Sequence, residues 1–160
     1  MATGDSLFAV IGGSFNPDST CDFTDRNGNP LAAFDDTTSE DARYSVYMPE
    51  HYDDGGLTFE LEVMAATAIT GDSDWEIGIE RSQVGTLDHD ADSFAANNVV
   101  NGTTVPGTAG VTQLITITFV TGGDMDGWVA GEWARINVGR NTADTASGDM
   151  QLLGVACRET

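Results

Sequence analysis

Alternation of apolar and polar residues, repeated in segment after segment, is the feature of this sequence that most constrains its fold. Residues 57–63 are the clearest case, with leucine, phenylalanine, leucine and valine separated by threonine and two glutamates. A period of two places the apolar side chains on one face of a strand and the polar ones on the other. The same alternation marks residues 44–48, 75–79, 115–119, 134–138 and 153–157. These segments predict half-buried strands of an all-β protein.

Short clusters of glycine, asparagine and aspartate separate the alternating segments, and the chain holds 19 glycines. Such residues tolerate the positive φ angles of tight reversals. Two weaker strands, at residues 8–11 and 31–34, bring the expected number to about eight. About eight antiparallel strands are typical of a jelly-roll-like two-sheet β-sandwich. One shared core is expected to contain Leu57, Phe59, Leu61, Val63, Trp75, Ile77, Ile79, Ile115, Ile117, Phe119, Ile136 and Val138.

The 160 residues suit one domain. We expect residues 31–160 to form the β-sandwich, and residues 1–30 to form either an N-terminal arm or its first strand. Residues 36–43 are polar and acidic and fit a loop or one short helix. Residues 88–110 lack clear alternation, and Pro106 excludes a central strand beside it.

Charge excludes two classes of partner. The formal net charge is −20, from 26 acidic residues against six arginines and no lysine. Such a surface repels phosphate backbones and anionic membrane surfaces, so neither nucleic acid nor a membrane is expected as a partner. No segment reads as an export signal or as a membrane span.

Catalytic motifs are absent from the sequence. Neither His51 nor His89 accompanies a nucleophile motif, and a phosphate-binding loop would need a lysine. Cys21 and Cys157 are expected to be reduced thiols, although a bridge between the two terminal segments stays open. We therefore expect no enzyme and no catalytic residues, with a small jelly-roll hydrolase as the weakest alternative.

Three alternate aspartates form the sharpest local motif. Asp88, Asp90 and Asp92 can direct several oxygens into one concavity, as calcium requires. The pattern departs from an EF-hand loop, because Ser93 stands at the glycine position and Val99 at the glutamate position. Calcium at these three aspartates and a solvated acidic loop both stay open, and no other cofactor is expected.

Tryptophans and arginines mark the ends of several strands. Trp75 begins an alternating segment and is expected in the core, whereas Trp128 and Trp133 could line a rim or an interface. Arg81 and Arg140 each end a strand, and each is expected to pair with a carboxylate, bidentately where geometry allows.

The N-terminal segment is apolar but interrupted by glycines and by Asn16-Pro17. It could lie across a neighbouring protein and order on contact, or it could simply contain the first strand of the domain. The candidate interface residues are Leu7, Phe8, Val10, Ile11 and Phe15, together with Trp128 and Trp133.

Residues 47–58, 70–76, 131–140 and 144–152 together resemble accessory structural proteins of tailed bacteriophage virions. The resemblance implies a jelly-roll-like domain that decorates a capsid or forms part of a tail or spike. It implies no catalytic residues.

The function that we expect from this resemblance is a capsid decoration or cement protein. It would be a homo-oligomer, expected as a trimer, bound to the major capsid protein or other virion proteins. Its location would be the virion, assembled in the host cytoplasm. The alternative is a tail-fibre, spike or carbohydrate-binding β-sandwich module that contacts host glycans. Exposed aromatic residues gathered in a groove would favour the alternative, and aromatic residues lying against a subunit contact would favour the first function.

Overall fold

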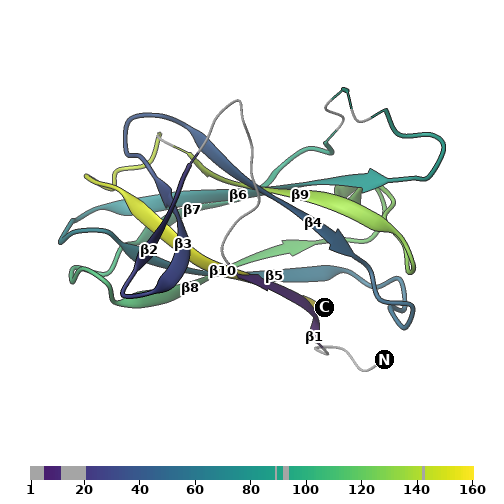
Figure 1. The fold of residues 1–160 in the computed structure, drawn as a ribbon, viewed down its shortest axis with the longest axis horizontal. Coiled ribbons are helices and arrows are strands. Elements are labelled where there is room, and N and C mark those ends of the chain that lie inside the picture. The colour runs from purple at the N-terminus through teal and green to yellow at the C-terminus, as the bar shows by residue number, and fades with distance from the viewer. Residues whose placement is uncertain (1–5, 12–20, 89, 92–93, 142) are drawn as a thin grey trace.

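A computed structural model shows a β-sandwich of two layers (Figure 1). The structure describes residues 6–11, 21–88, 90–91, 94–141 and 143–160, with the backbone alone for the last three residues of the first range. Within these ranges the one helical element is η1 (Gly123–Met125), a 3-10 turn, and no helix is long and apolar enough to cross a membrane.

Ten strands are present in the described residues. They are β1 (Ser6–Ile11), β2 (Asp22–Arg26), β3 (Asn29–Phe34), β4 (Glu40–Tyr47), β5 (Leu57–Ala65), β6 (Asp72–Ser82), β7 (Asn98–Thr104), β8 (Thr112–Phe119), β9 (Trp133–Asn141) and β10 (Met150–Glu159). One sheet has six strands in the order β2-β3-β10-β5-β8, with β1 also paired to β10, and the other has four in the order β4-β9-β6-β7. All pairings are antiparallel.

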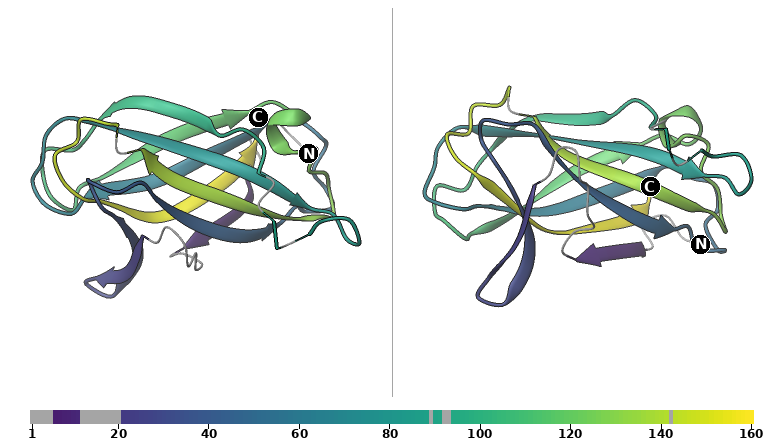
Figure 2. Two further views of the ribbon diagram at one scale, coloured as in Figure 1. Left: turned by 90° about the horizontal axis from the view of Figure 1, so that it is seen from above. Right: turned by 45° about the horizontal axis from the view of Figure 1, so that its top comes forward.

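The path from β3 to β10 gives the jelly-roll order, because consecutive strands alternate between sheets except at the β6–β7 hairpin. Figure 2 shows the two layers from other sides, with the β2–β3 hairpin extending away from them. The predicted jelly-roll-like sandwich is confirmed.

Alternation predicted the core correctly. All twelve expected side chains are buried in one cluster between the two sheets. Trp75 is fully buried, and its ring packs edge-on against Phe34 with 5.1 Å between centroids. Shifting the pairing of a strand by one residue would turn its whole apolar set toward solvent, so burial of that set opposes such a shift.

The alternation predicted for residues 153–157 is wrong at Leu153 alone. Leu153 is half-buried, whereas Leu152 is fully buried beside it. The register between β10 and β5 shifts between Leu152 and Gly154. A bulge of this kind adds one residue to a strand and reverses which side chains point inward. Beyond it, Val155 and Cys157 point inward as expected.

Two strands were not predicted, and one began earlier than predicted. β7 lies inside residues 88–110, but it is an edge strand and ends before Pro106, as the exclusion of a central strand requires. β4 begins at Glu40, so residues 36–43 are neither wholly a loop nor a helix. β2 joins β3 through Asn27 and Gly28, which both have positive φ, the geometry of a two-residue hairpin.

The N-terminal segment contributes a strand to the six-stranded sheet. β1 pairs with the second half of β10, and Leu7 is buried. The Phe8 ring lies 6.1 Å from that of Phe59 and 5.9 Å from that of Trp128. Trp128 is 2% exposed, so its expected place at a rim or interface is wrong. Phe15 and the side chains of residues 10 and 11 lie outside the described residues.

Candidate functional site

One end of the four-stranded sheet carries two exposed aromatic rings on its outer face. Tyr47 of β4 pairs with Trp133 of β9, and Trp133 pairs on its other side with Ser82 of β6. Their chain neighbours Val46 and Ala134 point into the core, so alternation directs both rings outward. Trp133 is 53% exposed and Tyr47 38%. The ring centroids are 5.4 Å apart at 58°, and we refer to this pair as the aromatic platform.

Hydrogen bonds beneath the platform hold its two strands together. The Met48 N–H donates to the Glu132 carbonyl at 2.9 Å, and the Gly131 N–H donates to the Met48 carbonyl at 3.0 Å. The Tyr47 hydroxyl donates to Glu50 Oε1 at 2.7 Å, and this bond raises the pKa of Tyr47. The platform is therefore preorganised on rigid strand ends.

The middle of the same outer face is covered by the segment that follows β6. The Phe94 ring lies 5.1 Å from the Arg43 guanidinium and 5.4 Å from that of Arg135. Arg135 pairs with the fully buried Glu80, and Arg43 Nε donates to Asn137 Oδ1 at 3.2 Å. Arg135 is thus ion-paired and Arg43 hydrogen-bonded within the protein, and both guanidiniums lie over the Phe94 ring, so the covered middle of the face is structural.

A glycine allows this segment to lie flat on the sheet. A Cβ atom at Gly78 would lie 2.4 Å from Asn97 Oδ1. Asn97 in turn donates from Nδ2 to Glu76 Oε1 at 2.8 Å. The outer face is thus covered near Gly78 and open at the end that carries the platform.

An ion pair fixes the start of β9, the strand that carries Trp133. Arg81 donates to Glu132 from Nε at 2.6 Å and from Nη2 at 2.7 Å, which confirms the predicted bidentate pairing. The hydrogen bond raises the pKa of Arg81 and lowers the pKa of Glu132. Because Glu132 directly precedes Trp133, the pair restrains the backbone that presents the indole.

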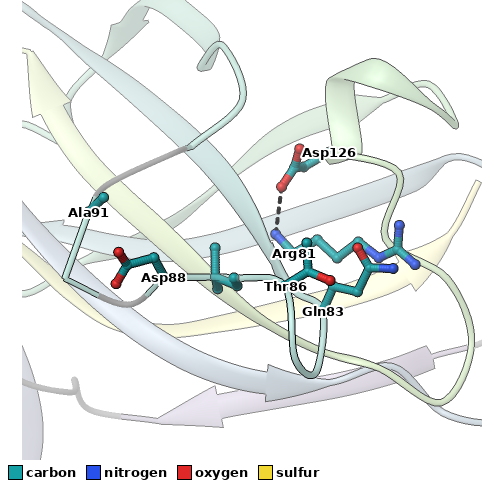
Figure 3. Close-up of a pocket in the computed structure, with 7 residues that line it drawn as sticks. Arg81, Gln83, Thr86, Asp88, Ala91 and Asp126 are labelled. Atoms are coloured by element: carbon teal, nitrogen blue, oxygen red, sulfur yellow. Dashed lines mark hydrogen bonds between the residues drawn. The ribbon is translucent and has the colours of Figure 1, made fainter.

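A pocket of about 440 Å³ opens at the end of β6 (Figure 3). The backbone N–H of Arg81 donates to Asp126 Oδ2 at 2.8 Å across one wall. The described residues that line the pocket are Arg81, Gln83, Thr86, Leu87, Asp88, Ala91 and Asp126.

Two of the three aspartates of the expected calcium motif lie within the residues that the structure describes. Asp88 and Asp90 are exposed, and the Asp90 N–H donates to Asp88 Oδ1 at 3.0 Å. Asp92 lies outside the described residues, so calcium at these aspartates stays a prediction.

A different cluster of three aspartates forms at another place in the fold. Among the described residues, carboxylate oxygens of Asp35, Asp36 and Asp149 lie within 4.8 Å of one another. Hydrogen bonds from Thr37 lower the pKa of Asp35. Two of the three side chains are exposed, and such groups are common on acidic surfaces without any ion.

The thiols and the described histidine offer no activated nucleophile. Cys21 and Cys157 are free and buried, and burial raises the pKa of Cys21 to about 12 and raises that of Cys157 as well. Neither thiol is ionised at neutral pH. His51 is exposed in a turn. The absence of enzymatic activity remains a prediction.

Sequence reasoning singled out Trp133 but not Tyr47 or the pocket. Tyr47 follows the inward Val46, so alternation alone predicted an outward tyrosine. Its position beside Trp133 depends on the pairing of β4 with β9, which no local pattern reveals. The pocket joins the end of β6, the segment after it and the η1 turn, and no motif spans these elements.

No protein-family model matches the chain, and no curated protein matches its sequence. Among solved structures, the xylan-binding module CBM15 is similar with a TM-score of 0.51 and 11% identity, covering 100% of this chain and 94% of that one. Isomalto-dextranase from Arthrobacter globiformis T6, solved with panose, is similar with a TM-score of 0.50 and 14% identity, covering 94% of this chain and 22% of that one. At such identities the likeness shows a shared jelly-roll β-sandwich fold.

Proposed function

We propose that this chain is a non-catalytic carbohydrate-binding module that holds a glycan on the aromatic platform. The observation that carries the proposal is the indole of Trp133, more than half exposed beside Tyr47 on the open end of a sheet. Large exposed aromatic rings brought together by a rigid fold are typical of interaction sites.

The chemistry of the platform suits a sugar ring. The face of an indole or phenol ring is apolar and carries the negative part of the ring quadrupole. The C–H face of a pyranose is apolar and slightly positive, so stacking removes apolar surface from water on both partners. The sugar hydroxyls then project sideways, where Ser45, Ser82 and Glu50 lie around the platform.

The fold supports the same ligand class by analogy, since the xylan-binding module has a similar sandwich over nearly its whole length. Exposed aromatic rings gathered in one place also favour the glycan alternative over capsid decoration. A major capsid protein partner, a trimer and a virion location stay predictions, because no described contact bears on them.

Replacing the tryptophan tests the proposal. Trp133→Ala should weaken binding to the neutral polysaccharide that the wild type binds by about fivefold to 150-fold, because stacking contributes about 1–3 kcal/mol. Affinity electrophoresis against xylan and dextran measures this loss. Folding should be unchanged, since the side chain is exposed.

Phe23→Ala is the matched control, because Phe23 is 41% exposed on β2 of the other sheet. It should bind like the wild type. A Trp133→Ala protein with undiminished retardation, or a wild type that binds neither polysaccharide, would contradict the proposal.

A further inference from the structure

We infer that the pocket at the end of β6 is a second sugar subsite that takes a neutral ring of the same glycan that stacks on the platform. This inference rests on the proposed function, and it assigns the ligand class of the pocket.

The pocket exists because β7 stops short of the end of β6. The pairing of β6 with β7 reaches Ile77, opposite Asn98. Beyond that point the Ala95 N–H donates to the Ile79 carbonyl at 2.9 Å, and Asp126 accepts the N–H of Arg81. The β6 edge is therefore satisfied without a neighbouring strand, which leaves room for the hollow between the following turn and η1.

The pocket and the platform share the same strand ends. Ser82 pairs directly with Trp133, and the two chain neighbours of Ser82, Arg81 and Gln83, line the pocket. Glu132, which precedes Trp133, holds the Arg81 guanidinium. Residues opposite each other in an antiparallel pair lie about 4.5–5.5 Å apart. Arg81 itself pairs with the inward-pointing Ala134, so its side chain lies on the opposite face of β6 from the Trp133 ring. One oligosaccharide can contact both sites where it crosses the edge of β6 that β7 leaves uncovered.

The lining side chains match the groups of a sugar ring. The Gln83 amide and the Thr86 hydroxyl each donate and accept hydrogen bonds, as sugar hydroxyls do. Leu87 and Ala91 add apolar surface for C–H groups. The N–H groups of Thr86 and Leu87 both donate to the Gln83 carbonyl at 3.1 Å, so a turn orders this wall before any ligand binds.

Charge selects a neutral ligand. Among the lining residues that the structure describes, Arg81 is the single cation, and its guanidinium is neutralised by Glu132. Asp88 and Asp126 add negative charge to the pocket. A uronate or a sulfated sugar would meet these carboxylates in a protein whose net charge is −20. Hydroxyls of a neutral ring can instead donate to them.

Calorimetric titration with oligosaccharides of increasing length tests the subsite. The probes are xylo-oligosaccharides and isomalto-oligosaccharides of one to six units, with oligogalacturonates as the acidic comparison. The pocket variant is the double substitution Gln83→Ala and Thr86→Ala, which touches no platform residue. The matched control is Val84→Ala, because Val84 lies in the same turn, is 95% exposed and does not line the pocket.

For the wild type, affinity for one neutral series should rise with length and then level off. The pocket variant should bind the shortest ligand like the wild type and lose at least fivefold on the longer ones, while Val84→Ala matches the wild type throughout. Equal affinity of the pocket variant and the wild type at every length would overturn the subsite, and so would preference for oligogalacturonates.

These failures are distinguishable from failure of the proposed function. If Trp133→Ala abolishes binding while the pocket variant changes nothing, glycan binding stands and the subsite falls. If the wild type binds none of the neutral or acidic sugars, both fall.

Discussion

Arg140 donates two parallel hydrogen bonds to the Asp144 carboxylate, from Nε at 3.0 Å and from Nη2 at 3.3 Å, and both side chains are almost completely buried. The same guanidinium donates to the carbonyls of Gly148 at 3.0 Å and Ala146 at 3.2 Å, and to that of Phe34 at 3.3 Å. One arginine at the end of β9 thus donates hydrogen bonds to backbone carbonyls in the turn that leads to β10 and at the end of β3. The predicted bidentate pairing of Arg140 with a carboxylate is confirmed.

Removing this guanidinium should be strongly destabilising. Arg140→Met should lower the free energy of unfolding by about 3–5 kcal/mol, because it leaves a buried carboxylate without its partner. Urea denaturation measures the loss. Arg158→Met is the matched control, since Arg158 pairs with Glu60 at 3.2 Å with both side chains a third or more exposed, and should cost less than about 1 kcal/mol. Equal losses in the two variants would refute this role.

A second prediction concerns the core. Leu61 is fully buried on β5, between β10 and β8. Leu61→Ala should cost about 2–5 kcal/mol, the sum of the lost transfer free energy and the cavity left behind. Leu114→Ala removes the same atoms from β8 at a side chain that is 65% exposed, and should change stability by less than about 0.5 kcal/mol. Chemical denaturation of both variants gives the comparison, and a loss below about 1 kcal/mol at Leu61 would mean that β5 is not central.

The strands that alternation predicted and those that it missed differ in burial. β5 and β8 each have an apolar inner face, so their residues carry the signal locally. β2 and β7 are largely exposed edge strands and need no apolar face. The bulge after Leu152 depends on pairing with β5, so no pattern within β10 could reveal that Leu153 turns away from the core.

The site was less predictable because it is built from long-range pairings. Trp133 could be singled out as a tryptophan that opens a strand, but its partner Tyr47 is brought beside it by the β4–β9 pairing. Trp128 looked equivalent in the sequence. Packing against Phe8 buries it instead, and its Nε1 donates to the Glu132 carbonyl at 3.0 Å.

A third prediction concerns pH. Arg81 holds the pKa of Glu132 below its ordinary value of 4.5. A carboxyl whose pKa is lower in the folded state contributes stability that is fully present above the unfolded pKa and lost as pH falls through the folded pKa. Near pH 7 the melting temperature of the wild type should therefore exceed that of Glu132→Gln by no more than about 4 °C. This difference in melting temperature should shrink below about pH 4.5.

Thermal melts of both proteins between pH 7 and pH 3 measure this difference. All other carboxyls are common to the two proteins, so their titration cancels. A difference that stays constant across the range, or that grows as pH falls, would show that the ion pair does not act through the charge of Glu132.

The fourth prediction concerns the two thiols. Burial, with smaller contributions from Glu40 and Asp41, raises the pKa of Cys21 to about 12, and burial also raises that of Cys157. At pH 8 the Cys21 thiol has on the order of a thousandfold less thiolate than a free cysteine, and the buried sulfurs of both cysteines are out of reach of a reagent. Ellman's reagent should therefore label the native protein slowly. In urea, with no reductant added, it should label two thiols per chain immediately.

The rate of native labelling then reports how often the sandwich opens. Reaction through opening follows the population of the open state, so a loss of 2–5 kcal/mol in Leu61→Ala should speed labelling by about 30-fold or more, while Leu114→Ala labels like the wild type. Immediate labelling of the native wild type would contradict the burial of both sulfurs. Failure to label in urea until a reductant is added would instead reveal a bridge between Cys21 and Cys157, the alternative that the sequence left open.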